Sequence, residues 1–197
     1  MKKLFFVFVV LLIILSPYQH INASFIDGSF SYGGSDFLMG SVVGEYLPNG
    51  KGKYGVGLDL YYFQQEIGTI KQKSYASSLH GIYNLQQKQS FALQLLFGFG
   101  ISQSFYDDTK SDVSFSPNIG ISGAYKLSEK FSLTGKTIFL IYSDGFSEPY
   151  SLSVDYRLNK KISVSAGISG KNDLILCEGE TSTTFKLGGM AGVRYGF

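Results

Sequence analysis

The residues of this chain that are able to carry out chemistry are few and scattered. His80 is the only histidine after residue 20, and Ser78 lies two residues before it. In a β-strand, residues two apart point to the same face, so a hydroxyl and an imidazole meet on one side. Nucleophilic catalysis by this pair also needs an orienting carboxylate and an oxyanion site. Because the sequence does not place Asp27 or Asp59 beside them, an enzyme working through His80 is only the third of three interpretations.

Other motifs that resemble ligand sites each lack part of the pattern. The acidic residues 107 to 112 lack the glycine and the terminal glutamate of a calcium loop. Residues 50 to 53, Gly-Lys-Gly-Lys, lack the spacing of a phosphate loop. Cys177 is the only cysteine, so a disulfide within the chain and a Cys/His metal site are both excluded by count. We therefore expect no cofactor and no metal.

The elements that must position these residues follow from one repeated pattern. Between residues 90 and 101 the large apolar side chains share one parity, and Leu96 is the one apolar residue of the opposite parity. The apolar set is Phe91, Leu93, Leu95, Phe97, Phe99 and Ile101. A period of two predicts a strand with one apolar face. Similar segments recur to the last residue, and each can point its charges to the same side. The pattern predicts an all-β fold, a transmembrane up-and-down antiparallel β-barrel.

The strand count follows from the turns. Short polar turns begin after Tyr46, Tyr83, Tyr125 and Tyr156. With both termini at the short-turn end, four such turns imply ten strands. The predicted strands are residues 25–33, 38–47, 53–64, 74–85, 90–105, 113–127, 131–143, 149–158, 161–170 and 181–197. Because residues 34 to 36 form a very short connection, eight strands with an irregular amino-terminal segment are the alternative. We expect longer loops at residues 66–73, 107–112, 144–149 and 172–180, at the cell-surface end.

The charges support this arrangement. An Arg or Lys on the lipid face near the bilayer midplane costs about 2 to 4 kcal/mol, so a barrel sequence must turn its charges inward. Parity places nine charged residues in the lumen: Asp27, Glu45, Asp59, Lys126, Lys136, Asp155, Arg157, Lys186 and Arg194. A lumen with a backbone diameter on the order of 20 Å leaves little room for them. Charges of mixed sign in such a space should pair, so we predict a charge network that closes the lumen.

The first 23 residues have the layout of a secretory signal. Met-Lys-Lys precedes an apolar run from Leu4 to Leu15 and a polar stretch that ends at Ala23. This run is shorter than the roughly 20 residues that a transmembrane helix needs. We expect cleavage before Ser24 and one domain over residues 24–197. Lys2 and Lys3 account for the net charge of +2, so the mature chain is near neutral and nucleic-acid binding is not expected.

The carboxy-terminal run is the most recognisable segment. It alternates and ends on an aromatic residue, through Phe185, Leu187, Gly189, Ala191, Val193, Tyr195 and Phe197. This run resembles the closing strand of the small Gram-negative outer-membrane β-barrel proteins. The resemblance implies an outer-membrane location and recognition by the barrel-assembly machinery, with Tyr195 and Phe197 as the assembly signal.

These observations lead to three interpretations of function. The leading one is a monomeric, non-enzymatic integral outer-membrane protein with a closed, charged lumen and a structural or surface-interaction role. Its expected partners are outer-membrane lipid and, during biogenesis, the assembly machinery. The second is a narrow, porin-like channel for ions or small solutes. The third is the membrane-embedded enzyme that uses His80.

Overall fold

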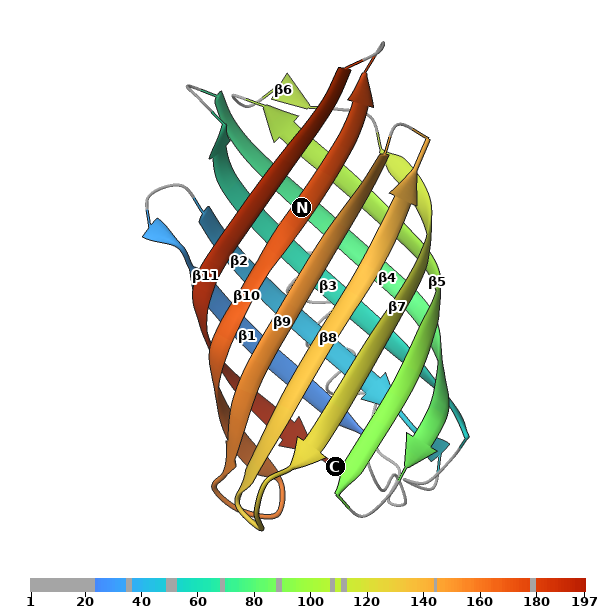
Figure 1. The fold of residues 1–197 in the computed structure, drawn as a ribbon, viewed down its shortest axis with the longest axis vertical. Coiled ribbons are helices and arrows are strands. Elements are labelled where there is room, and N and C mark those ends of the chain that lie inside the picture. The colour runs from blue at the N-terminus through green and yellow to red at the C-terminus, as the bar shows by residue number, and fades with distance from the viewer. Residues whose placement is uncertain are drawn as a thin grey trace.

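Ten long antiparallel strands close into a barrel in the computed structural model (Figure 1). The structure describes residues 24–34, 37–48, 53–67, 70–87, 90–106, 109–110, 113–143, 145–177 and 180–197. The expected signal segment, residues 1–23, lies outside them. The strands are β1 Phe25–Tyr32, β2 Phe37–Tyr46, β3 Tyr54–Ile67, β4 Ile70–Gln87, β5 Phe91–Tyr106, β6 Thr109–Lys110, β7 Ser114–Lys126, β8 Phe131–Tyr142, β9 Gly145–Arg157, β10 Ile162–Cys177 and β11 Glu180–Gly196. The predicted ten-stranded fold is confirmed, and the two-residue β6 is an addition at the end of β5.

The barrel closes where the first strand meets the last. β1 pairs with β11 from Phe25↔Gly196 to Tyr32↔Gly189. This pairing avoids the cost of unpaired backbone groups at an open strand edge in hydrocarbon. The backbone N–H of Phe197 donates to the carbonyl oxygen of Ser24 at 3.1 Å. Both residues therefore lie at one end, the lower end of Figure 1, and the opposite end is called the upper end below.

The two faces of the wall are those that parity predicts. On β5, Phe97 and Phe99 are 54% and 75% exposed, while Leu96, which precedes them and has the opposite parity, is 0% exposed. The same alternation of exposed and buried residues runs along β4, β7 and β9. The apolar parity faces outward and the mixed parity faces the lumen, so a lipid-facing surface surrounds a partly polar interior.

Aromatic side chains form two bands around the outer surface. The lower band includes Tyr54 with Tyr83, whose ring centroids are 5.5 Å apart, and Phe131 with Tyr156 at 5.0 Å. The upper band includes the ring pairs Tyr62–Tyr75, Tyr75–Phe105 and Tyr150–Phe185. Phe185 and Phe197 lie about 40 Å apart along β11, or roughly 28 Å along the axis at a strand tilt of about 45°. This spacing matches an apolar belt between two membrane interfaces.

The upper connections differ from the prediction. β3 continues to Ile67 and β4 begins at Ile70, and β10 continues to Cys177 before β11 begins at Glu180. The expected loops at residues 66–73, 144–149 and 172–180 are therefore wrong, because the strands extend into tight hairpins, and β9 already begins at Gly145. Above the upper aromatic band the outer face leaves the hydrocarbon and the inner face carries buried polar residues such as Gln65 and Gln72, so the apolar alternation ends while the hydrogen-bonded ladder continues. Among the described residues, no helix is long and apolar enough to cross a bilayer.

Candidate functional site in the barrel lumen

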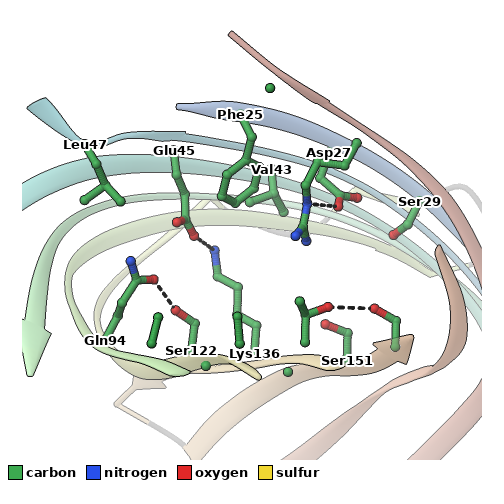
Figure 2. Close-up of a pocket in the computed structure, with 18 of the residues that line it drawn as sticks. Phe25, Asp27, Ser29, Val43, Glu45, Leu47, Gln94, Ser122, Lys136 and Ser151 are labelled. Atoms are coloured by element: carbon green, nitrogen blue, oxygen red, sulfur yellow. Dashed lines mark hydrogen bonds and ion pairs between the residues drawn. The ribbon is translucent and has the colours of Figure 1, made fainter. Parts of the chain in front are cut away.

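Lys136 crosses the lumen and joins two walls of the barrel. It projects from β8, and its Nζ lies 2.8 Å from Asp59 Oδ1 on β3 and 3.3 Å from Glu45 Oε1 on β2. Figure 2 shows the contact with Glu45 bridging the open space between the walls. Glu45 is 6% exposed and Asp59 is 0% exposed. One cation therefore compensates two buried carboxylates that lie far from it along the chain.

Arg194 makes a second bridge, closer to the seam between β1 and β11. Its Nε lies 2.9 Å from Asp27 Oδ2, and one terminal nitrogen lies 2.9 Å from Asp155 Oδ2. The hydroxyl of Ser153 also donates to Asp155 at 3.1 Å. The guanidinium carbon sits 4.6 Å from the centroid of the Phe25 ring. Arg194 is thereby held between β1 and β9 by two carboxylates and an aromatic face.

Six of the nine predicted lumen charges thus meet in one place. This set, called the lumen network here, is Asp27, Glu45, Asp59, Lys136, Asp155 and Arg194. It holds four carboxylates against two cations. A site with this balance attracts cations more readily than anions.

The other three predicted residues lie elsewhere. Lys126 and Arg157 are the last residues of β7 and β9 and are exposed at the lower rim. Lys186 lies near the upper end, where β1 and β2 are shorter than their neighbours. Its Nζ donates to the backbone carbonyl oxygen of Glu66 on β3 at 3.1 Å, above the ends of the shorter strands β1 and β2. Parity indicates which face a side chain takes, but not its height in the barrel, so it could not separate these three from the network.

Sequence reasoning missed a buried ion pair in the upper lumen. Lys171 Nζ lies 2.9 Å from Asp173 Oδ2 and 4.8 Å from the centroid of the Phe63 ring. The lysine and aspartate side chains are 8% and 13% exposed. Both follow the inward parity of β10, but the predicted strand ended at residue 170. Extending the parity three residues further would have found them.

The acidic side chain of Glu148 faces outward, which parity did not predict because residue 148 was expected in a loop. Glu148 belongs to β9 and accepts hydrogen bonds from Thr137 Oγ1 and Asn172 Nδ2, both at 2.9 Å. These two donors lie on the neighbouring strands β8 and β10. Hydrogen bonds from these two side chains therefore stabilise the Glu148 carboxylate at the upper part of the outer surface.

An apolar cluster fills part of the lumen beside the charges. Leu96 and Ile138 are both 0% exposed, and Gly120 pairs with both of them across β7. A Cβ on Gly120 would lie 2.4 Å from the carbonyl oxygen of Thr137, so the absence of a side chain lets the walls approach. The cluster comprises Phe37, Met39, Leu47, Tyr61, Phe63, Ala76, Ile82, Leu96, Ile138 and Leu140. Leu96, the exception to parity in the sequence, is thus a packing residue of the interior.

The structure places Asp59 near His80, which the sequence could not do. His80 Nδ1 lies 3.4 Å from Ser78 Oγ and 4.0 Å from Asp59 Oδ2. Ser78 also accepts a hydrogen bond from Asn118 Nδ2 at 2.8 Å. The same ring nitrogen faces both the hydroxyl and the carboxylate, whereas a catalytic triad uses one nitrogen for each. His80 is only 2% exposed, and a Cβ on Gly57 would lie 2.3 Å from its Nε2, so the ring packs directly against the wall.

The described strands enclose a lower and an upper cavity in the lumen. The lower one has a volume of about 360 Å³ and is lined by Asp27, Glu45, Lys136 and Arg194 together with serines and glycines (Figure 2). The upper one has a volume of about 420 Å³ and is lined by Gln65, among others. The two cavities share no lining residue. Within the described part of the chain, no group of three or more His, Cys, Asp or Glu side chains is arranged to hold a metal ion.

Comparisons with known proteins gave matches among solved structures only. No protein family and no curated protein matches the sequence. Among solved structures, the outer-membrane protease OmpT from Escherichia coli shares 10% identity, with a TM-score of 0.48 over 90% of this chain and 94% of that one. Neisserial surface protein A shares 14% identity, with a TM-score of 0.40 over 88% of this chain and 94% of that one. OmpT of Vibrio cholerae shares 13%, with a TM-score of 0.41 over 86% of this chain and 64% of that one. At these identities the likeness is one of fold alone.

Proposed function

We propose that this protein is a monomeric, non-enzymatic integral outer-membrane protein with a closed lumen, which acts through its structure or through the surface of its upper end. The observation that carries the proposal is the Lys136 bridge between opposite walls, beside the fully buried Leu96 and Ile138. The apolar outer face and its two aromatic bands support a membrane location. We further propose that the protein is exported by a cleaved signal and inserted by the barrel-assembly machinery through Tyr195 and Phe197.

The absence of an enzymatic role is supported by the surroundings of His80. Its ring is enclosed by the wall, and neither Ser78, at 0% exposed, nor Asp59 is open to a substrate. An active site needs a cavity in which a reacting atom contacts the nucleophile and its base. The histidine instead belongs to the hydrogen-bonded packing around Asp59 and Asn118.

A narrow channel is the second candidate, and the two lumen cavities favour it. One cavity lies in the lower part of the lumen and the other in the upper part. A continuous channel would have to join them past Lys136 and the apolar cluster. Four carboxylates against two cations would make such a path cation-selective.

Single-channel recording in planar bilayers separates the two candidates. We expect no steady conductance from the wild-type protein, because Lys136 and the apolar cluster occupy the middle of the lumen. Lys136→Ala should increase the frequency of openings, whereas Lys126→Ala, at the exposed lower rim, should not. A steady, cation-selective conductance of the wild-type protein would refute the closed lumen and support the channel.

A further inference from the structure

The lipid-facing surface carries one groove among its otherwise projecting side chains. It has a volume of about 530 Å³ and crosses the outer face of β1 to β5. Its upper side is a row of outward residues that are paired from strand to strand: Gly40, Tyr62, Tyr75 and Gln103. Its lower side is the parallel row Val42, Leu60, Ser77 and Ile101. We call this feature the outer groove.

The floor of the outer groove is backbone. Ser41, Tyr61, Ala76 and Ser102 lie between the two rows and point their side chains into the lumen. The rows are two residues apart along each strand, or about 6.6 Å, and the groove runs about 19 Å from β1 to β5. These dimensions suit a single hydrocarbon chain lying across the strands. Gly40 leaves its position open, since a Cβ there would have no heavy atom within 4 Å.

Polar and cationic residues lie directly above the upper row. Tyr62 donates its hydroxyl proton to Gln64 Oε1 at 2.9 Å, and Lys73 pairs with Gln64 across β3 and β4. Lys71 is the next outward residue of β4, and its Nζ lies 3.6 Å from Glu66 Oε1, with the lysine side chain 67% exposed. An exposed ion pair of this kind contributes little and is readily exchanged. The outer surface is thus apolar in the groove, and directly above the groove it carries two lysines, one of them paired with Glu66.

We propose that the outer groove holds one acyl chain of a phosphate-bearing glycolipid in the leaflet at the upper end, with its phosphate on Lys71 and Lys73. The two lysines supply the charge that a phosphate requires. The amide groups of Gln64 and Gln103 beside them suit the hydroxyls of a saccharide. The choice of a glycolipid rests on the proposed orientation, in which the upper end faces the outside.

Glycine variants on the same lipid-facing surface provide a matched test. Gly40→Phe fills the outer groove. Gly189→Phe places the same ring on β11, where a Cβ also meets no heavy atom within 4 Å. Purified barrels in detergent are titrated with lipid A, an acylated, bisphosphorylated disaccharide, and bound lipid is counted by native mass spectrometry. Phosphatidylglycerol serves as the competing lipid.

We expect the wild-type barrel to retain one lipid A, with about tenfold weaker binding for Gly40→Phe and unchanged binding for Gly189→Phe. The double variant Lys71→Gln/Lys73→Gln should weaken binding several-fold. Each barrel is first shown to be folded by its heat-modifiable migration, and Gly40→Leu replaces Gly40→Phe if the larger side chain prevents folding.

Equal binding by the two phenylalanine variants, or no lipid A retained by the wild-type barrel, would overturn the proposal. Preferential binding of phosphatidylglycerol would overturn it as well and would indicate the opposite orientation. None of these results bears on the closed lumen, which the conductance measurement tests separately.

Discussion

Removing the Lys136 ammonium should strongly destabilise the barrel. Lys136→Met keeps the length of most of the side chain but leaves Glu45 and Asp59 without their cation at 6% and 0% exposure. The matched control is Lys126→Met on the neighbouring strand, because Lys126 is exposed at the lower rim.

The magnitude follows from the two contacts. At about 3 Å and an effective dielectric constant of about 20, each ion pair has a gross Coulomb energy of roughly 5.5 kcal/mol. The loss of this Coulomb energy is partly offset in Lys136→Met, because folding no longer requires the lysine ammonium to be desolvated. That desolvation costs several kcal/mol per ion. Breaking a buried pair from one side typically costs about 3 to 5 kcal/mol, and we expect that loss in the free energy of unfolding. The Lys126→Met control should stay within about 0.5 kcal/mol of wild type.

Equilibrium unfolding in urea, with the protein in lipid vesicles, measures both variants. The chain contains no tryptophan, so circular dichroism and heat-modifiable migration report the folded fraction. Adding Asp59→Asn to Lys136→Met should restore about 1 to 2 kcal/mol of the free energy of unfolding. The substitution replaces an unpaired buried carboxylate with a neutral amide that still accepts a hydrogen bond from the Tyr61 hydroxyl. A loss below about 1 kcal/mol for Lys136→Met would refute the reasoning, since the carboxylates would then be solvated without the lysine.

Two further predictions concern the wall and its closure. Leu95→Arg should lower the free energy of unfolding by about 2 to 4 kcal/mol in the same assay, because it sets a charge against acyl chains. Gln94→Arg should cost only about 1 kcal/mol, since Gln94 faces the lumen and loses hydrogen bonds with Asn84 and Ser122, and equal effects would contradict the assigned faces. Deletion of Phe197 should reduce the protein in the outer membrane of cells while leaving refolding in micelles intact. Normal levels in cells would show that the assembly machinery does not recognise the terminal aromatic residue. Failed refolding would show that the hydrogen bond from the Phe197 N–H to Ser24 is needed for a stable barrel.

The fold was accessible from the sequence because two strong rules act on every strand. Side chains alternate with a period of two, and hydrocarbon excludes charge from one of the two faces. Together they placed Leu95 outward and Gln94 inward, and the turns after four tyrosines implied ten strands. The same rules lose their force above the upper aromatic band, where the outer face leaves the hydrocarbon, and there the hairpins of β3–β4, β8–β9 and β10–β11 were mistaken for loops.

Only part of the candidate site could be predicted from the sequence. Parity placed Lys126 and Lys136 on the same face, but it carries no information on height or on which strands face one another. Only the closed barrel decides that Lys136 meets Glu45 and Asp59 across the lumen while Lys126 lies in water at the rim.

What the sequence by itself determined is therefore the direction of each side chain relative to the wall, because that depends on neighbours along the strand. What only the tertiary structure decided is the set of side chains that touch. The contacts of Arg194 with Asp27 and Asp155, the partners of Leu96 in the apolar cluster, and the outer groove beside Gly40 depend on the register between strands and on barrel closure. Register arises from pairing between distant segments, and no local pattern in the chain records it.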